Sequence, residues 1–245
     1  MTGRVSTRAV VAVSVVILYS SVLTAIYCNF PEMKPEEKVD FKLPRSLGDA
    51  KRLGNVLSHY KDQHFYTVLS GVAAVYVVLQ SFAIPGSIFL TILSGYLFPF
   101  WMALILVCAC SACGAGMCYY LSFTLGRELV NKFFPDKLKH WQNEVRKQRG
   151  DLFNYIVFLR VTPILPNWFI NIASPVIDVP FWAFFFGTLV GVAPPSFLFI
   201  QAGTTLQMMT NTNAVMSWTS MAALAFFAAL SLVPVIYKRY KVKAE

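Results

Sequence analysis

Two stretches of this 245-residue chain decide its fold: IPGSIFLTILSGYLFPFW at residues 84–101 and LPNWFINIASPVIDVPFW at residues 165–182. An offset of 81 residues aligns the first proline of each stretch and the PFW triplet that begins 14 residues later. Such short, interrupted apolar runs cannot cross a bilayer core of about 30 Å as straight helices. They require cover from protein or from a wet cavity. The pair therefore predicts two re-entrant or broken helices at equivalent places of an internal repeat, as in transporter-like folds.

Composition places both stretches in a membrane protein. Residues of the AVILMFWYC set make up 56% of the chain and charged residues 13%, against roughly 25% charged in soluble domains. No Asp, Glu, Lys or Arg occurs from Gln63 to Gly126, and Asp178 alone interrupts a second block from Val161 to Tyr237. The net charge of +9 comes from basic residues just outside these blocks, which disfavours nucleic-acid binding. The sequence predicts an all-α polytopic membrane protein.

Five further apolar segments are expected to span the membrane alongside the two broken helices. They are Ala9–Cys28, Phe65–Ile84, Trp101–Leu125, Phe181–Ile200 and Trp218–Tyr237. The first follows Arg4 and Arg8 and could be a cleaved signal peptide. Its length and the absence of a small-x-small cleavage site favour a retained anchor.

Two polar segments predict amphipathic helices at the membrane surface. Ser46 and Asp49 form an S-x-x-D start that is followed by apolar residues at helical spacing. The segment 126–151 holds three apolar residues on one helical face, with basic residues around them: Leu138, Trp141 and Val145. This second helix either attracts anionic headgroups or serves as a topology-setting connector.

Lysine and arginine counts predict which ends face the cytosol. By this rule the basic loop at 127–149 and the basic tail at 238–245 are cytosolic, whereas the uncharged residues 201–217 suit the far side. Five full spans would then leave the N-terminus outside the cytosol, together with Arg4 and Arg8. If the N-terminus is cytosolic, one broken segment must cross completely. The sequence leaves both alternatives open.

No catalytic or nucleotide-binding motif occurs in the chain. Because H-E-x-x-H, G-x-S-x-G, G-x-x-x-x-G-K-[ST] and G-x-G-x-x-G are all missing, we expect neither an enzyme nor an ATP-driven pump, and no cofactor is implied. Four cysteines lie in one apolar run without a nearby histidine or carboxylate: Cys108, Cys110, Cys113 and Cys118. We interpret them as small packing residues, so no metal site is expected.

Arg160 and Asp178 are the polar anomaly of the second broken segment. They flank a predicted hairpin whose ends should be close, so we expect an ion pair between them. The pair would be either functional or a structural staple, and Asp178 could instead sit at the membrane interface. Thr162, Asn167, Asn171 and Ser174 add polar groups that either line a groove for a headgroup or satisfy broken-helix carbonyls.

The last five residues fit a K-x-K-x-x retrieval signal through Lys241 and Lys243. Coat proteins read such a signal at a cytosolic C-terminus and return membrane proteins to the endoplasmic reticulum. The signal is short, but it agrees with the side predicted for the tail.

The motifs around both breaks resemble the VTT domain of the DedA superfamily, close to its stasimon-type branch, the transmembrane protein 41 group. The resemblance covers roughly residues 44–240. It rests on seven segments: Ile84–Leu90, Ser94–Gly95, Phe158–Pro163, Leu165–Asn171, Ser174–Pro175, Gly191–Ser196 and Ala202–Thr205.

The resemblance implies an inverted repeat with two facing re-entrant loops and an ATP-independent phospholipid scramblase of the endoplasmic reticulum. It also implies support of autophagosome formation, lipid droplets, lipoproteins and viral replication sites. Phospholipids, with phosphatidylserine and sterol among the lipids considered, and related membrane proteins would be the partners. Bacterial relatives carry membrane-embedded acids in the first half, but this chain has none between Gln63 and Gly126, which favours a passive path.

Three parts are therefore expected: an anchor and amphipathic linker at 1–64, a VTT/DedA-like membrane domain at 65–237, and a basic cytosolic tail at 238–245. An ion-coupled small-solute transporter and a non-transporting membrane scaffold remain the alternatives to a scramblase. Candidate residues of the lipid path lie at the two breaks: Pro85, Gly86, Ser94, Gly95, Arg160, Thr162, Pro163, Pro166, Asn167, Asn171 and Asp178.

Overall fold

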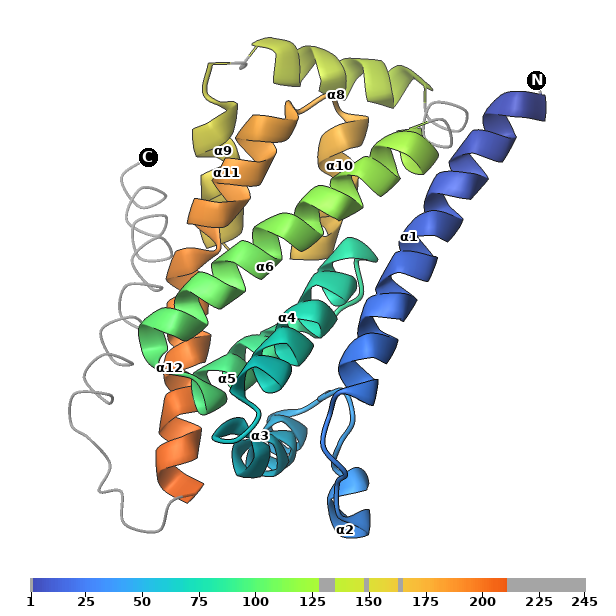
Figure 1. Ribbon diagram of the computed structural model, residues 1–245. Helices are drawn as coiled ribbons and strands as arrows, with labels where there is room; N and C mark the ends of the chain where they lie inside the picture. The colour runs from blue at the N-terminus through green and yellow to red at the C-terminus, as the bar shows by residue number, and fades with distance from the viewer. Residues whose placement is uncertain (1, 128–134, 148–149, 163–164, 211–245) are drawn as a thin grey trace, which may run out of the picture.

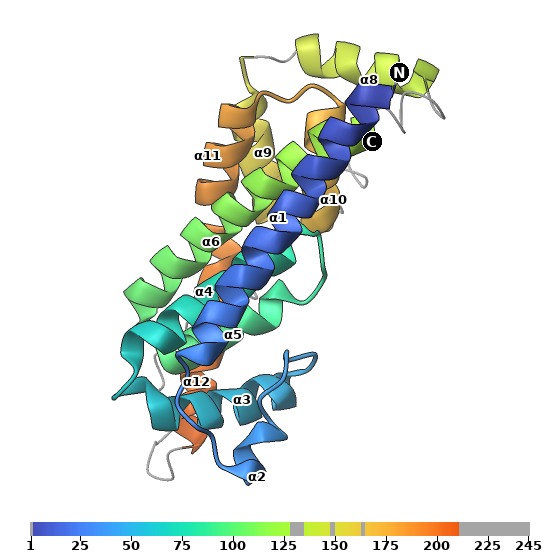
Figure 2. The ribbon, with the colours of Figure 1, turned by 45° about the vertical axis from the view of Figure 1, so that its right-hand side comes forward.

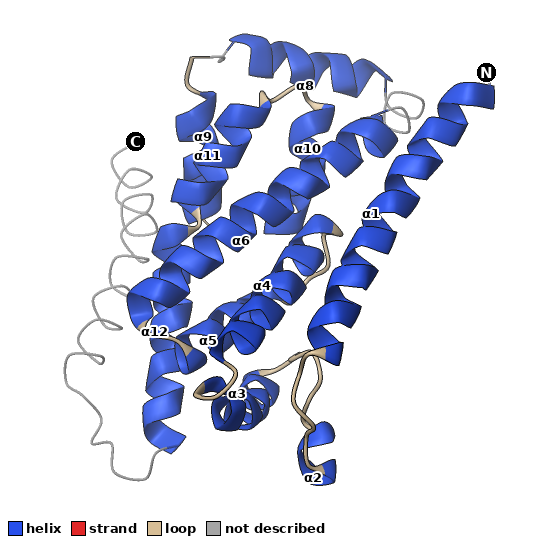
Figure 3. Ribbon diagram, viewed as in Figure 1, coloured by secondary structure: helices blue, strands red, loops and turns tan. Residues whose placement is uncertain are grey.

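The computed structural model describes residues 2–127, 135–147, 150–162 and 165–210, and every regular element in these ranges is a helix (Figure 3). The elements, labelled in Figure 1, are α1 (Thr2–Cys28), α2 (Pro35–Lys38), α3 (Leu47–Lys61), α4 (Phe65–Ser81), α5 (Ser87–Leu97), α6 (Phe100–Leu121), the π-helix η1 (Ser122–Gly126), α8 (Pro135–Lys147), α9 (Leu152–Val161), α10 (Asn167–Val176), α11 (Phe181–Gly191) and α12 (Ala193–Thr210). The expected all-α fold is confirmed.

The internal repeat is visible in where helices begin. Pro99 caps the start of α6 and Pro180 caps the start of α11, both with extended backbone. Gly86 precedes α5 at a φ of +120°, a conformation that suits glycine, and Pro166 precedes α10. The succession α4–α5–α6 therefore corresponds to α9–α10–α11, as the offset of 81 residues predicts.

The two repeats exchange their short helices. α5 packs most extensively on α12, which belongs to the second repeat, whereas α10 packs on α6 and η1 of the first repeat. Within each repeat, α4 contacts α6 and α9 contacts α11. Each hairpin is thus covered by the long helix of the other repeat, and this cover shelters its broken backbone from lipid.

Both hairpins end partway through the molecule and enter from opposite ends (Figure 1). α4 starts beside α3 and turns back into α5, while α9 starts beneath α8 and turns back into α10. The expectation that residues 65–84 form a full span is therefore wrong, because α4 ends at Ser81 and forms one limb of a hairpin.

Three segments are long and apolar enough to cross a membrane within the described residues: Val10–Cys28, Phe100–Gly126 and Phe181–Met209. The expected span at 218–237 lies outside those residues. The N-terminus of α1 lies at the end of the molecule that carries α8 (Figures 1 and 2). Because α4 does not cross, the N-terminus shares the side of α8 without any broken segment spanning completely. Neither alternative considered for five spans applies.

Two close helix contacts fix the first hairpin. A Cβ atom added at Gly95 of α5 would overlap the carbonyl of Ile200 on α12, and one added at Gly203 of α12 would overlap the carbonyl of Ile92. The hydroxyl of Thr204 donates a hydrogen bond of 3.1 Å to the Gly95 carbonyl. Backbone therefore meets backbone here, an approach that only small residues allow.

Surface helices cover the two ends of the molecule. α3 lies at the end opposite α8 (Figure 2), and Ser46 caps it by accepting a 3.1 Å hydrogen bond from the Asp49 amide. At the other end, α8 buries Leu138 and packs Val145 on the buried apolar cluster that contains Ile156, Ile170 and Phe184, while Trp141 stays exposed. Both helices form where amphipathic helices were expected.

Candidate functional site

A buried arginine lies where α9 ends. The Arg160 side chain is 95% covered, and the structure surrounds it with uncharged oxygen acceptors from two other helices, α10 and α11. Its Nη1 donates to the side chain of Asn167 at 3.0 Å, while Nη2 donates to Asn171 at 2.6 Å and to the Thr188 hydroxyl at 3.0 Å. The guanidinium also faces the Phe184 ring, 5.4 Å from its centroid. α9, α10 and α11 thus hold it in one orientation.

The arginine has no acidic partner among the described residues. Within the described ranges, all of its hydrogen-bond acceptors are neutral, and its buried Nε–H has no acceptor. An intramembrane arginine costs about 2.5 to 3.5 kcal/mol on insertion scales and usually faces a cavity or a partner. A charge in this state would gain from an anion that could accept from its free donor.

The two hairpins meet at this centre through their amides. The Asn171 amide donates to the Gln80 carbonyl oxygen of α4 at 3.3 Å. Gln80 in turn donates to the Ser87 hydroxyl at the start of α5 at 3.4 Å. This chain of polar groups joins Arg160 to the turn of the first hairpin.

A second, neutral network lies inside the first repeat. The Tyr76 hydroxyl is 3.1 Å from the Thr91 hydroxyl, and Ser111 donates to Tyr76 at 3.1 Å. These three side chains come from α4, α5 and α6 and are all buried. Among the described residues, the buried polar groups of the first repeat are therefore uncharged, whereas the second repeat buries a charge.

The site opens toward the surface on the side of the α10 start. Asn167 and Pro166 are exposed although Arg160 directly beneath is buried, and Asn167 also offers its backbone carbonyl to Arg160 at 3.4 Å.

The expected Arg160–Asp178 ion pair is wrong. Asp178 pairs instead with Arg127 at 2.9 Å and with Arg146 of α8 at 3.8 Å. The cause is the direction of the hairpin: α10 returns toward α8 after the turn, and its ten residues rise about 15 Å. Asp178 therefore lies at the α8 end, in line with the interfacial alternative, whereas Arg160 lies at the hairpin tip.

Among the described residues, the other candidates for the lipid path form no hydrogen bond with Arg160, and two of them bond their own helices. Pro85 and Gly86 form the turn of the first hairpin. Ser94 is buried and bonds the Leu90 carbonyl of its own helix at 2.8 Å. Thr162 likewise bonds its own helix, through the Phe158 carbonyl at 2.7 Å. Pro163, Lys241 and Lys243 lie outside the described residues.

Sequence reasoning missed two members of the site, Gln80 and Thr188. Gln80 follows 15 uncharged residues of an apolar helix, and an amide in such a place is a signal that it bonds another polar group inside the membrane. Thr188 follows a phenylalanine-rich run and carries no comparable signal, because threonine hydroxyls commonly bond their own helix.

Metal-binding chemistry has no visible support in the part of the chain that the structure describes. No three His, Cys, Asp or Glu side chains gather there in a way that could hold a metal ion. Cys108, Cys110 and Cys118 are buried on α6, Cys113 is exposed, and none of them forms a disulfide.

Comparisons with known proteins agree with this architecture. Residues 84–205, which run from the turn of the first hairpin into α12 and contain the whole second hairpin, match the VTT domain family. A Transmembrane protein 41 homolog of Caenorhabditis elegans is 58% identical over 221 residues, covering 90% of this chain and 89% of that protein. Transmembrane protein 41B of Homo sapiens is 50% identical over 244 residues, covering 99% and 84%. No solved structure gives a significant match. The chain therefore belongs to the transmembrane protein 41 group of VTT-domain membrane proteins.

Proposed function

We propose that this protein is a phospholipid scramblase that moves lipids between the two leaflets in both directions without ATP and without covalent chemistry. The observation that carries the proposal is the buried Arg160 guanidinium, which has neutral partners only and lies where the two half-crossing hairpins meet. In this proposal it binds phosphate groups of lipids in passage.

The physical argument concerns the cost of moving a headgroup through a bilayer. A phosphate is expelled from hydrocarbon, and charge-assisted hydrogen bonds to a guanidinium offset part of that cost. Arg160 is held by Asn167, Asn171 and Thr188, so its donors are oriented before a lipid arrives. Neutral partners suit a transient ligand, because a permanent carboxylate would compete with each arriving phosphate.

The alternatives explain fewer of these features. An ion-coupled transporter normally uses buried carboxylates, and none lies between Gln63 and Gly126. A scaffold has no need for two hairpins that end inside the membrane or for a charged group at their meeting point. Passive movement requires only a sheltered polar path.

The same proposal covers location and cellular role. We place the protein in the endoplasmic reticulum as a multi-pass protein whose α8 end and C-terminus face the cytosol, where Lys241 and Lys243 meet coat proteins. There it would supply phospholipids for autophagosome formation and lipid homeostasis, as its family resemblance implies.

A leaflet assay tests the proposed activity. Purified protein is reconstituted into liposomes that contain a trace of fluorescent phospholipid, and dithionite is added outside without nucleotide. The proposal expects bleaching well above the half that belongs to the outer leaflet, in proportion to the fraction of vesicles that contain protein. Bleaching that stays at half with folded, inserted protein would overturn the proposal.

A further inference from the structure

An apolar cavity lies beside the first hairpin, apart from the residues that bind Arg160. Its volume is about 300 Å³, which reaches the range of small-molecule sites. α1, the loop after it, α3, α4 and α5 all contribute walls, through residues such as Ile26, Phe41, Leu57, Val72 and Leu93. Neither the repeat nor the arginine centre accounts for this space.

The character of the lining defines what could fill it. Nearly all lining side chains are apolar, and Lys42 is the one charged residue among them. Its walls include α1, which is long and apolar enough to cross a membrane, and the surface helix α3, so we expect hydrocarbon chains of a bilayer to reach it. A small polar solute would gain nothing from such walls, whereas an acyl chain would bury its methylene groups there.

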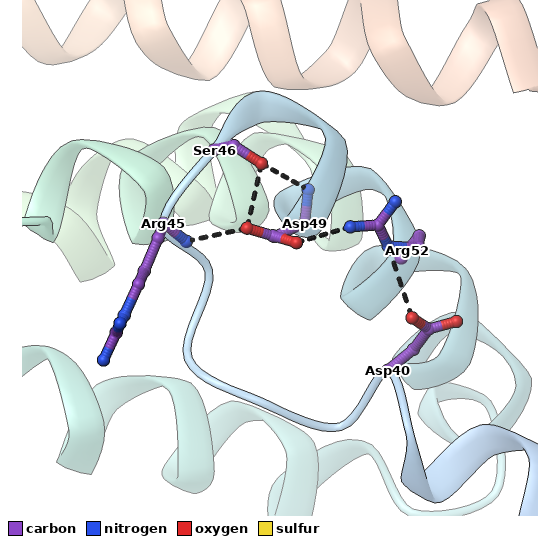
Figure 4. A network of polar contacts seen from close by, with 5 residues as sticks. All are labelled: Asp40, Arg45, Ser46, Asp49 and Arg52. Carbon is purple, nitrogen blue, oxygen red and sulfur yellow. Dashed lines mark hydrogen bonds and ion pairs between the residues drawn. The ribbon is translucent and has the colours of Figure 1, made fainter.

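Two arginines near the cavity, Arg52 and Arg45, differ in their contacts with acidic side chains. Arg52 pairs with Asp40 at 3.3 Å and with Asp49 at 2.5 Å (Figure 4). Arg45 gives Asp49 only its backbone N–H, at 3.3 Å, and its side chain extends away from the other labelled residues in Figure 4. The nearby acids are therefore occupied by Arg52, while the Arg45 guanidinium has no acidic partner among the described residues.

Lys42 is unpaired in the same way. It is exposed, and its ammonium group has no hydrogen bond or ion pair within the described ranges. Glu37 on α2 already accepts hydrogen bonds from Tyr60 and from His59, the latter at 3.0 Å. Two free cations thus flank Leu43 and Pro44, which line the cavity.

We propose that this cavity binds one acyl chain of an anionic phospholipid whose headgroup contacts Lys42 and Arg45. The apolar walls select an amphiphile, and the two free cations select a net negative headgroup over a zwitterionic one. The bound lipid joins α1 and the loop at 30–44 to the first hairpin. This site does not depend on the proposed scramblase activity, because Arg160 takes no part in it.

Photo-crosslinking in liposomes tests the site. The full-length protein is reconstituted into phosphatidylcholine vesicles with a trace of phosphatidylglycerol or phosphatidylcholine that carries a diazirine on one acyl chain. After illumination, peptide mass spectrometry locates the labelled residues. We expect phosphatidylglycerol to label peptides that contain Leu57, Val72 or Leu93 several times more strongly than phosphatidylcholine does.

Three variants separate headgroup from tail recognition. Lys42→Gln combined with Arg45→Gln should lower phosphatidylglycerol labelling several-fold, down to the phosphatidylcholine level. Lys38→Gln, another exposed cation of the same segment, should leave it unchanged. Gly71→Leu should lower labelling by both lipids, because the nearest atom to a Cβ at Gly71 is 3.6 Å away and the added side chain enters the cavity.

The outcomes decide the proposal. Equal labelling by the two lipids, or a preference that survives loss of both Lys42 and Arg45, would overturn the anionic headgroup. Labelling of the cavity peptides no stronger than that of the exposed α1 surface would overturn the site itself. If Gly71→Leu fails to fold, the two-cation variant still decides, because both of its positions are exposed.

Discussion

The two hairpins share one arrangement of helices, but at equivalent positions the second repeat buries polar side chains and the first buries apolar ones. Shifting by 81 residues sets Arg160, Asn171 and Thr188 of the second repeat against Leu79, Leu90 and Val107 of the first. All three apolar counterparts are at least 95% buried and belong to one apolar core cluster. The position that holds a guanidinium in one half therefore holds a leucine in the other.

This difference separates what the fold needs from what the site needs. Leu79 and Leu90 show that a half-crossing hairpin packs well with an apolar centre. The arginine and its amides are consequently not required to build a hairpin of this kind. Burying these groups costs folding free energy that the first repeat does not lose. A role in binding explains why the second repeat keeps them.

The largest expected effect comes from breaking the backbone contact of the first hairpin. Gly95→Val places a branched side chain against the Ile200 carbonyl, which cannot move away without shifting α12. We expect destabilisation by about 3 kcal/mol or more, seen as loss of the monodisperse peak in detergent. Gly71→Ala, where a Cβ meets Ile26 at an ordinary 3.6 Å, is the control and should behave as wild type. Normal folding of Gly95→Val would refute the packing account.

Making the second hairpin resemble the first should affect function next. Asn171→Leu installs the residue found at Leu90 and removes the 2.6 Å acceptor of Arg160. We expect lipid exchange to fall by roughly tenfold, because a charge-assisted hydrogen bond contributes about 1.5 to 3 kcal/mol. Ser174→Ala on the same helix is the matched control, since its hydroxyl bonds only the Ile170 carbonyl. Equal exchange rates in the two variants would show that Asn171 does not orient the arginine.

A smaller effect is expected at the α8 end of the second hairpin. Asp178→Asn weakens the contacts with Arg127 and Arg146, all partly exposed, so stability should fall by about 1 kcal/mol or less. Lipid exchange should persist. Because Asp178 and Arg160 share no partner, their substitutions should act additively in a double-mutant cycle on thermal stability. A coupling energy above about 1 kcal/mol would show that Arg160 and Asp178 interact directly, in contradiction to the structure.

The smallest effect concerns acid pH at the surface of the first repeat. Hydrogen bonds from Tyr60 and then from His59 lower the pKa of Glu37 below its ordinary value of 4.5. The carboxylate therefore stabilises the fold fully above that value, and this contribution is lost as pH falls through the lowered pKa. Melting curves of wild type and Glu37→Gln should differ at pH 6, and the difference should shrink as the pH falls below the ordinary value of 4.5 and through the lowered pKa. Curves that stay equally separated over this pH range would contradict this assignment.

The hairpins and their repeat were predictable because proline and glycine act locally. Pro99 and Pro180 precede helix starts because proline restricts its own backbone, whatever the tertiary contacts nearby. The spacing seen in the sequence is therefore also the spacing of the helix starts in the structure. The end of α4 was not predictable in the same way. Residues 82–84 are as apolar as the helix before them, and only the packing of α5 on α12 shows that the chain turns back there.

The site was predictable in part. Arg160, Asn167 and Asn171 stand out as polar residues near breaks of an apolar segment, and the structure brings them together. The predicted pairing of Arg160 with Asp178 was wrong. Both residues flank the same broken segment in sequence, but the sequence does not show that one lies at the tip of the hairpin and the other at its α8 end. Thr188 and Gln80 come from segments distant in sequence, and only the tertiary fold joins them to the arginine.

The central claim is that Arg160 serves lipid passage and not the stability of the hairpin. Leaflet exchange of Arg160→Leu, the residue found at the equivalent Leu79, tests it most directly. We predict folded, inserted protein whose dithionite bleaching stays near the half expected for the outer leaflet, because the substitution removes a buried charge that has no acidic partner among the described residues, and the removed burial cost offsets the lost hydrogen bonds. Arg160→Lys should fold and exchange lipid more slowly than wild type, since an ammonium group lacks the planar donor set. Bleaching of Arg160→Leu vesicles at the wild-type rate and extent would contradict the claim.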